Sequence, residues 1–194
     1  GQSDTDLTFM NRPSYSCLEE IIEKDFPDSE IYYSLPDNYT GLLENRKLLL
    51  KRHDDEITDW KEALVKSGAD NLIRIFADAP FCDPEIIAEM LEIHTKYIAE
   101  YTYSENLPEG FCCDILSREL IQSLPEPDDD KKSLPIKQVI KTNINQFDVE
   151  LFYKEPDIRS KRTAFRTGRR REQITMERIY TISDRIPSYS EISD

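Results

Sequence analysis

The chain has 194 residues, of which 38% are hydrophobic and 33% are charged, so it can form one folded domain with a buried core. Its net charge of −14 opposes non-specific binding to nucleic acids or to anionic membranes. No apolar run is long enough for a membrane-spanning helix, so we expect no membrane partner.

The first part of the chain predicts alternating helices and strands. Residues 1–13 are polar and are expected to form a flexible N-terminal segment. Ser16 and Glu19 match a capping box ahead of an apolar helical face. The elements expected next are a strand at 30–35, a strand at 47–52 and a helix at 54–67 closed by Gly68. At 47–52 the apolar run is too short to distinguish a strand from a helix, and we favour a strand.

Residues 71–87 carry the most informative pattern. Asn71–Phe76 is typical of a buried strand, which ends before Pro80 because proline cannot donate to a sheet. Asp83 suits the N-cap of the next helix, and Pro84 suits its first position. Asp78 therefore lies at the carboxyl end of a strand, where open α/β sheets bind ligands, and is a candidate ligand for a hard cation. The alternative is a turn aspartate that bonds its own backbone.

The rest of the chain continues the alternation. The expected elements are a helix from Pro84 to about Lys96, strands at 97–103, 111–116 and 147–152, and helices at 117–123 and 134–142. This order predicts a three-layer α/β domain whose mostly parallel sheet includes both 30–35 and 71–76. We divide the chain into the segment 1–13, an α/β domain at 14–152, and a basic helical segment with a frayed tail at 153–194.

The basic residues are concentrated near the C-terminus. Residues 1–133 carry 13 basic and 30 acidic side chains, whereas Arg159 to Arg178 contains eight basic and two acidic residues. This run could contact phosphate or nucleic acid, or it could dock on the acidic body of the chain or on a partner domain. Because the charge of the whole chain opposes DNA and RNA, we favour docking and expect no nucleic-acid partner.

The cysteines indicate reduced thiols. The four cysteines include no C-x-x-C pair and only two histidines could join them, so zinc and iron–sulfur sites are not expected. The adjacent Cys112 and Cys113 would point to opposite faces of a strand and would not bond each other. We therefore expect buried thiols in a cytoplasmic protein.

Two segments, FADAPFCDPEIIAEMLEIH and YTYSENLPEGFCCDILSREL, carry a family resemblance. They resemble the sugar-activating cytidylyltransferases of the spore-coat polysaccharide type. They are also similar to the nucleotidyltransferase-like N-terminal domain of spiro-SPASM proteins, which precedes a radical SAM domain and a SPASM segment. The matching positions are Asp78, Pro80, Phe81 and Asp83; Ala99–Thr102; Ile144–Glu150; and Asp157 with Arg159.

The resemblance implies a nucleotide-diphospho-sugar transferase-like fold of the GT-A/Rossmann-like kind. It also implies a reaction in which a sugar hydroxyl attacks the α-phosphate of CTP, with Mg²⁺ held by two carboxylates. Asp78 matches the first ligand position, and Asp148 or Asp157 is the candidate for the second. Asp148 could instead be an exposed strand residue and Asp157 an N-cap. The candidate substrate-binding residues are Gly110, Asp114 and Tyr101, and no catalytic residue is assigned.

Three departures from the family pattern affect the expected activity. The family's Gly-rich, Arg/Lys-bearing loop, which clamps the triphosphate, has no counterpart before Asn11. The glutamate after the P-x-G turn is Asp114 here, and the radical SAM cysteine triplet is absent, so no iron–sulfur cluster is expected in this chain. We therefore expect a catalytically silent recognition or scaffold domain for a radical SAM/SPASM region, with CTP or a sugar nucleotide as a candidate ligand. The alternative is a Mg²⁺-dependent cytidylyltransferase that activates a sugar.

Overall fold

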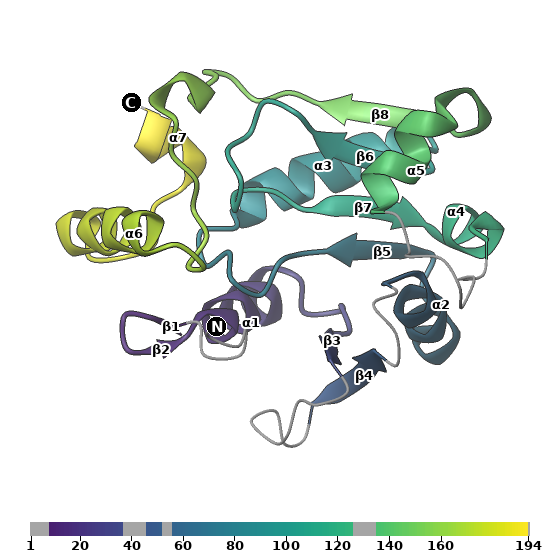
Figure 1. Ribbon diagram of the computed structural model, residues 1–194, viewed down its shortest axis with the longest axis horizontal. Coiled ribbons are helices and arrows are strands. Elements are labelled where there is room, and N and C mark those ends of the chain that lie inside the picture. The colour runs from purple at the N-terminus through teal and green to yellow at the C-terminus, as the bar shows by residue number, and fades with distance from the viewer. Residues whose placement is uncertain (1–7, 37–45, 52–55, 126–134, 194) are drawn as a thin grey trace.

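The computed structural model describes residues 8–36, 46–51, 56–125 and 135–193, and its main sheet is mixed. The strands are β5 (Asn71–Arg74), β7 (Asp114–Ser117), β6 (Tyr101–Ser104) and β8 (Val149–Phe152), in the spatial order β5-β7-β6-β8. β7 is antiparallel to both neighbours, and β6 is parallel to β8. β5, β6 and β8 therefore run in the same direction, and their carboxyl ends meet at one edge of the sheet (Figure 1).

Two smaller sheets lie outside this main sheet. β1 (Thr8–Phe9) and β2 (Arg12–Pro13) form an antiparallel hairpin, and β3 (Tyr32–Pro36) pairs in parallel with β4 (Lys47–Lys51). The α/β class and the strand at 47–51 are confirmed. The prediction that 30–35 and 71–76 share one mostly parallel sheet is wrong, because β3 and β5 belong to different sheets.

The mixed character of the main sheet follows from a short connection. β6 ends at Ser104 and β7 begins at Asp114, with no helix between them. Parallel neighbours need a crossover of a dozen or more residues, usually through a helix, so this loop permits only antiparallel pairing. Strand–helix alternation along the sequence therefore predicted the elements but not which strands became neighbours.

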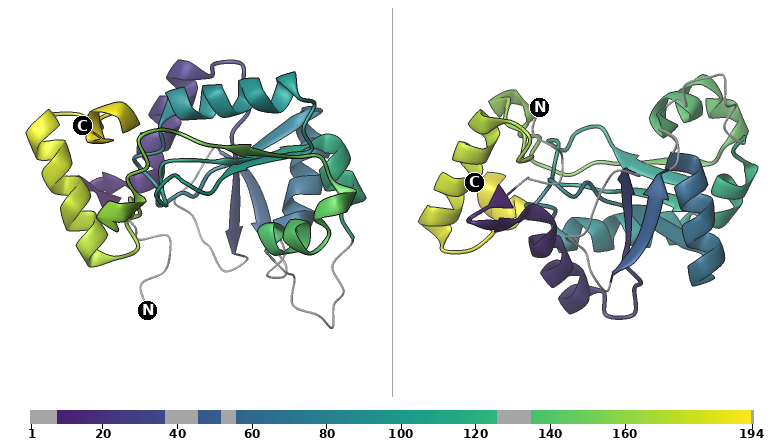
Figure 2. Two further views of the ribbon diagram at one scale, coloured as in Figure 1. Left: turned by 90° about the horizontal axis from the view of Figure 1, so that it is seen from above. Right: turned by 60° about the horizontal axis from the view of Figure 1, so that its bottom comes forward.

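Helices cover both faces of the main sheet and produce three layers. The helices are α1 (Ser14–Asp25), α2 (Glu56–Ser67), α3 (Pro84–Lys96), α4 (Arg118–Ser123), α5 (Ile136–Thr142), α6 (Arg170–Ser183) and α7 (Tyr189–Ser193). α3 packs on one face with α1 beside it, whereas α2, α4 and α5 pack on the other (Figure 2). None of the described helices has both the length and the apolar character that a membrane crossing requires.

Helix ends follow the local signals in the sequence. Asp83 Oδ1 accepts a hydrogen bond from the Glu85 N–H at 2.9 Å, and Ser117 Oγ accepts one from the Leu120 N–H at 3.1 Å. Gly68 closes α2 with a φ of +69°, the left-handed conformation typical of a helix C-terminus. The predicted element ends at Arg52, Asp54 and Leu134 lie outside the described residues.

α1 begins earlier than the capping-box pattern predicts. It starts at Ser14, directly after Pro13, and Ser16 lies within its first turn. The Ser16 hydroxyl donates to the Pro13 carbonyl at 2.7 Å instead of capping the helix, and Glu19 accepts a hydrogen bond from Arg46 Nε at 2.7 Å. The predicted capping box is therefore wrong, because both of its side chains have other partners.

The N-terminal hairpin is ordered rather than flexible. Phe9 is 1% exposed, and its ring makes edge contacts at 5.7 Å with the rings of Phe81 and Tyr180. The prediction of a flexible segment is thus wrong for residues 8–13, because an aromatic side chain anchors a polar stretch in the core. Residues 1–7 lie outside the described part.

The C-terminal segment shares the main core. Phe165, Met176 and Tyr189 are each no more than 1% exposed, and they pack in one cluster with Phe81 and Phe111. The predicted basic helical segment is present as α6, and a second short helix, α7, follows it. The predicted frayed tail is wrong, since α7 is docked, and the predicted boundary at 152/153 does not coincide with a break in the packing.

His94 joins α3 to the sheet. It is 2% exposed, its Nδ1 lies 2.8 Å from Thr102 Oγ1, and its Nε2 lies 3.1 Å from Asn71 Oδ1. Both ring nitrogens therefore have a polar partner. Burial lowers the pKa of His94 below its ordinary value.

This lowered pKa predicts a pH-dependent contribution to stability. The unfolded chain takes up a proton on His94 near pH 6.5, whereas the folded chain does so only at lower pH, so the contribution is complete above about pH 6.5 and declines below it. We expect the difference in free energy of unfolding between wild type and His94→Gln to shrink from about pH 7.5 to about pH 5.5. Urea titrations at several pH values measure it, and a constant difference would contradict the assignment.

Candidate functional site

Asp78 lies in the turn after β5, at the edge where the three strands end. It is 7% exposed, and its carboxylate faces the guanidinium of Arg166. Arg166 Nε lies 2.9 Å from Oδ1 and 3.0 Å from Oδ2, and Nη2 lies 2.8 Å from Oδ1. The guanidinium carbon also lies 4.4 Å from the centroid of the Phe76 ring. Arg166 thus neutralises Asp78 and stacks on an aromatic ring, which is a favourable geometry for a guanidinium.

Residues 165–168, called here the strap, carry Arg166 across the site. The Thr167 N–H donates to the Asp78 carbonyl at 2.8 Å, and the Phe165 N–H donates to the Glu109 carbonyl at 2.7 Å. The strap therefore binds both the turn after β5 and the loop before β7. These backbone bonds fix Arg166 independently of its own ion pair.

Gly110, a predicted substrate-binding residue, lies directly beneath the strap. Its φ is +96°, and a Cβ at this position would lie 2.2 Å from the Phe165 carbonyl oxygen. Only glycine permits both this backbone conformation and so close an approach. The described structure assigns Gly110 a packing role against the strap.

Asp114 and Tyr101, the other two predicted substrate-binding residues, are buried in the sheet. Asp114 is 4% exposed and lies opposite Arg74 on the neighbouring strand, which donates to it through Nη2. Lys137 Nζ lies 3.4 Å from Asp114 Oδ1. Tyr101 is fully buried, its ring stacks on that of Tyr103 at 5.0 Å, and burial raises its pKa. Asp114 is therefore held by two cations, and Tyr101 stays protonated at neutral pH.

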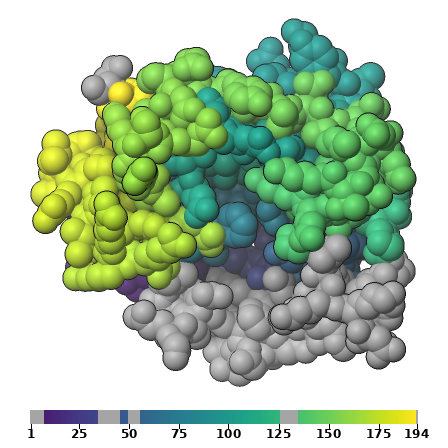
Figure 3. All heavy atoms as spheres, turned by 45° about the horizontal axis from the view of Figure 1, so that its top comes forward, coloured from purple at the N-terminus to yellow at the C-terminus, as the bar shows by residue number. Residues whose placement is uncertain are grey.

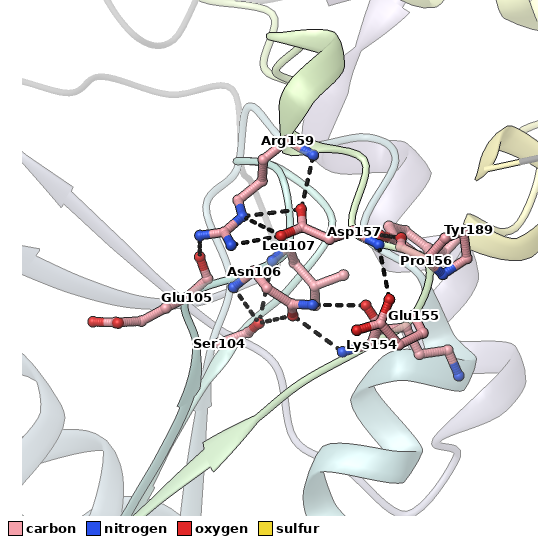
Figure 4. A network of polar contacts seen from close by, with 10 residues as sticks. All are labelled: Ser104, Glu105, Asn106, Leu107, Lys154, Glu155, Pro156, Asp157, Arg159 and Tyr189. Carbon is pink, nitrogen blue, oxygen red and sulfur yellow. Dashed lines mark hydrogen bonds and ion pairs between the residues drawn. The ribbon is translucent and has the colours of Figure 1, made fainter.

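Asp157 belongs to a polar junction between the ends of β6 and β8 (Figure 4). Its Oδ1 accepts hydrogen bonds from the Arg159 backbone N–H at 2.9 Å and from Arg159 Nε at 3.0 Å, and these bonds lower its pKa to about 2. Beside it, Asn106 Nδ2 donates to the Lys154 carbonyl at 2.7 Å, and Asn106 Oδ1 accepts from the Lys154 N–H at 3.0 Å. Asp157 thus has its own cation at this junction.

The three predicted metal ligands do not converge. Asp148 precedes β8 and its carbonyl accepts from the Tyr101 N–H, so it lies at the amino ends of β6 and β8, whereas Asp78 follows the carboxyl end of β5. Asp157 follows β8, which is separated from β5 by β7 and β6, and its carboxylate is bonded to Arg159. Among the described residues, no three His, Cys, Asp or Glu side chains are grouped to hold a metal ion. Asp78, Asp148 and Asp157 therefore do not form one three-carboxylate metal site, and Mg²⁺ binding at Asp78 stays a prediction.

A cavity of about 720 Å³ adjoins the site between the small parallel sheet and the free edge of β5. α1 and α2 also contribute to its lining, which includes Tyr33, Trp60, Leu72 and Phe76. Phe76 thus borders both this cavity and Arg166. Figure 3 shows that the surface is hollowed between the C-terminal helices and the segment around α5.

Arg166 is the residue that the sequence analysis did not assign to the site. It belongs to the basic run that we expected to dock on the acidic body, and the expectation is confirmed at Asp78. The charge pattern predicted an acidic partner but could not identify which carboxylate. Arg74 offers a clearer prediction, because a basic residue within an apolar strand needs a buried acidic partner. In the structure that partner is Asp114.

Comparisons with known sequences give a short match. No protein-family model matches the sequence. A stretch of 50 residues is 36% identical to the spore coat polysaccharide biosynthesis protein SpsF of Bacillus subtilis (strain 168). The match covers 26% of this chain and 21% of that protein, so it spans about one fifth of the relative's length.

Comparisons with solved structures cover most of the chain. A cytidylyltransferase from Leptospira borgpetersenii serovar Hardjo-bovis (strain JB197) aligns with a TM-score of 0.73 at 14% identity, over 92% of this chain and 80% of that chain. The 4-diphosphocytidyl-2C-methyl-D-erythritol synthase from Anaerococcus prevotii DSM 20548 gives 0.62 at 9% identity, over 91% and 93%. The CMP:2-keto-3-deoxy-manno-octonic acid synthetase complexed with CTP gives 0.57 at 13% identity, over 77% and 82%. The chain has a cytidylyltransferase-like fold.

The two left-handed glycines provide a matched test of the strap. A Cβ at Gly68 would have no atom within 4 Å, whereas a Cβ at Gly110 would overlap the Phe165 backbone. Gly68→Ala is expected to cost about 1 kcal/mol of conformational strain, and Gly110→Ala about 3 kcal/mol or more, because the strap must also move. Urea denaturation measures both values, and equal losses would show that the strap does not require Gly110.

Proposed function

We propose that this cytidylyltransferase-like domain acts as a recognition or scaffold module and does not transfer nucleotides. The observation that carries the proposal is the Asp78–Arg166 pair. Both carboxylate oxygens at the family's first metal position accept hydrogen bonds from one guanidinium. A buried carboxylate in such a pair has its charge compensated without a metal ion.

Two further features support a silent site. Asp148 and Asp157, the candidates for a second metal ligand, lie at other places on the sheet. Residues 8–13, directly ahead of α1, contain no glycine and form a hairpin anchored by Phe9. Each preorganised donor to a transferring group contributes on the order of 3 kcal/mol to catalysis, so the loss of several would lower the rate by many decades.

The resemblance of two sequence motifs indicates which partners such a module would have. The D-x-P-F-x-D signature at Asp78–Asp83 and the D-x-R element at Asp157–Arg159 are similar to those of domains that precede a radical SAM/SPASM region. We propose this region of the same protein as the partner. CTP or a sugar nucleotide is the proposed ligand, bound without conversion.

A second candidate is a Mg²⁺-dependent cytidylyltransferase that activates a sugar. The observation in its favour is the same Arg166, since a guanidinium from the basic run lies at the carboxyl edge of the sheet, where it could bind a phosphate. The two candidates therefore differ in the partner of Arg166, which is Asp78 in the first and the nucleotide in the second.

A turnover assay separates the two candidates. The purified chain is incubated with CTP, Mg²⁺ and a panel of sugars and sugar acids, and pyrophosphate release is measured. We expect no release above the protein-free blank. Release by the wild type that disappears in both Asp78→Asn and Arg166→Gln would favour the second candidate.

A stability measurement tests the pair itself. If Asp78 is the structural partner of Arg166, Asp78→Asn leaves a guanidinium without its counter-ion and should lower the free energy of unfolding by about 1–3 kcal/mol. Asp157→Asn is the matched control, because it removes the carboxylate of an exposed Asp–Arg pair and should have a much smaller effect. Urea denaturation without nucleotide or metal gives both values. An unchanged stability for Asp78→Asn would contradict a structural role.

A further inference from the structure

Among the described residues, β8 has a partner strand on one edge only. It pairs with β6 on one side, and no other element in the described chain borders its second side (Figures 1 and 2). The Asp148 carbonyl accepts from the Tyr101 N–H at 3.2 Å, and both backbone groups of Lys154 bond the Asn106 side chain. The even-numbered residues from 148 to 154 therefore direct their backbone groups toward β6 and the loop that follows it.

The odd-numbered residues face the open edge. Because backbone groups alternate sides along a strand, the N–H and C=O groups of Val149, Leu151 and Tyr153 point away from β6. The side chains of these residues share one face of the sheet. Leu151 is 40% exposed and Tyr153 is 59% exposed. An edge with free backbone groups and exposed apolar side chains is a template for adding a strand.

The sequence of this edge is complementary to itself. When a second β8 lies antiparallel with Leu151 opposite Leu151, Val149 faces Tyr153 and Asp148 faces Lys154. The first two pairings join apolar side chains, and the third joins opposite charges. Lys154 Nζ also lies 2.6 Å from Glu89 Oε2 of its own chain, so an incoming Asp148 would extend an existing ion pair.

Two other registers also direct the backbone groups of the odd-numbered residues toward the second strand, and both are less favourable. Centring the pairing on Val149 would place Asp148 opposite Glu150, and like charges directly opposite each other are destabilising. Centring it on Tyr153 would place Leu151 opposite Glu155. The register centred on Leu151 places Glu150 opposite Phe152, but it avoids like-charge pairs and joins Asp148 to Lys154, so it is the most favourable of the three.

We propose that two copies of this chain associate through their β8 strands in this register. The dimer has two-fold symmetry, and the main sheets of the two copies form one continuous sheet. Each of the three outward-facing pairs exchanges two backbone hydrogen bonds, about six in all. Such a contact is isologous and closes after two copies, because it uses the β8 edge of each copy.

The oligomeric state tests the proposal. Sedimentation velocity or light scattering from micromolar to millimolar protein should show a monomer–dimer equilibrium for the wild type. Leu151→Lys places two ammonium groups at the symmetry axis and should give a monomer across this range. Ile182→Lys is the matched control, since Ile182 is 87% exposed on α6, and it should dimerise like the wild type. A monomeric wild type at millimolar concentration, assemblies larger than a dimer, or an undiminished dimer in Leu151→Lys would overturn the proposal.

Two further measurements keep the test independent of any folding defect in that variant. Asp148→Lys sets a lysine opposite Lys154 of the second copy and should weaken dimerisation, while a thermal melt confirms that the variant is folded. In the wild type, rising protein concentration should slow amide hydrogen exchange at Val149, Leu151 and Tyr153. Exchange at Glu150 and Phe152, whose N–H groups face β6, should stay the same. Slowing at both sets, or at neither, would contradict the proposed pairing.

Discussion

The packing of Phe81 is the constraint on which most of this structure depends. Phe81 is fully buried in the turn between β5 and α3, and its ring contacts those of Phe9, Phe111 and Phe165 at centroid distances of 5.7, 6.3 and 5.5 Å. These rings come from the N-terminal hairpin, the loop before β7 and the strap. Aromatic side chains bury large apolar areas, so three segments that are distant in the sequence pack against this one turn. Asp78 lies in the same turn, three residues before Phe81.

Asp83, at the end of the same turn, ties local structure to the C-terminus. One carboxylate oxygen caps α3, and the other accepts a hydrogen bond from the Tyr189 N–H at 2.6 Å. The Tyr189 hydroxyl in turn donates to the Pro156 carbonyl at 2.7 Å. Three positions of the D-x-P-F-x-D motif therefore have structural roles. Asp78 binds the strap, Phe81 packs in the aromatic cluster, and Asp83 accepts a hydrogen bond from α7.

Features set by neighbouring residues could be predicted from the sequence, and features set by long-range contacts could not. The cap at Asp83 and the closure at Gly68 depend on a few adjacent residues, and both were predicted correctly. The capping box at Ser16 and Glu19 was the exception, since Glu19 bonds the distant Arg46 instead. The order of the strands depends on which edges meet after folding, and the alternation pattern carries no such information. The docking of α7 was missed for a related reason, since its composition is polar and its position depends on the single buried ring of Tyr189.

The candidate site shows the same division. The sequence predicted that Asp78 lies at the carboxyl edge of a strand, because a proline and a helix start fix that turn locally. It could not predict that Arg166, 88 residues later, would be the partner of Asp78. A basic run has many acidic residues available to it, and only the fold decides between them.

The pairing of a buried carboxylate with a guanidinium has a physical logic in such a fold. A carboxylate that is 7% exposed needs a compensating positive charge, because a buried charge without a partner is strongly destabilising. Arg166 supplies that charge from within the chain, so the fold keeps Asp78 without depending on a cation from solution. The pair is also hard to separate. To release Asp78, Arg166 must give up its place over Phe76, and the backbone bonds of the strap to Asp78 and Glu109 hold it nearby. A domain built in this way can retain the shape of a cytidylyltransferase while one of its carboxylates serves to hold the C-terminal segment in place.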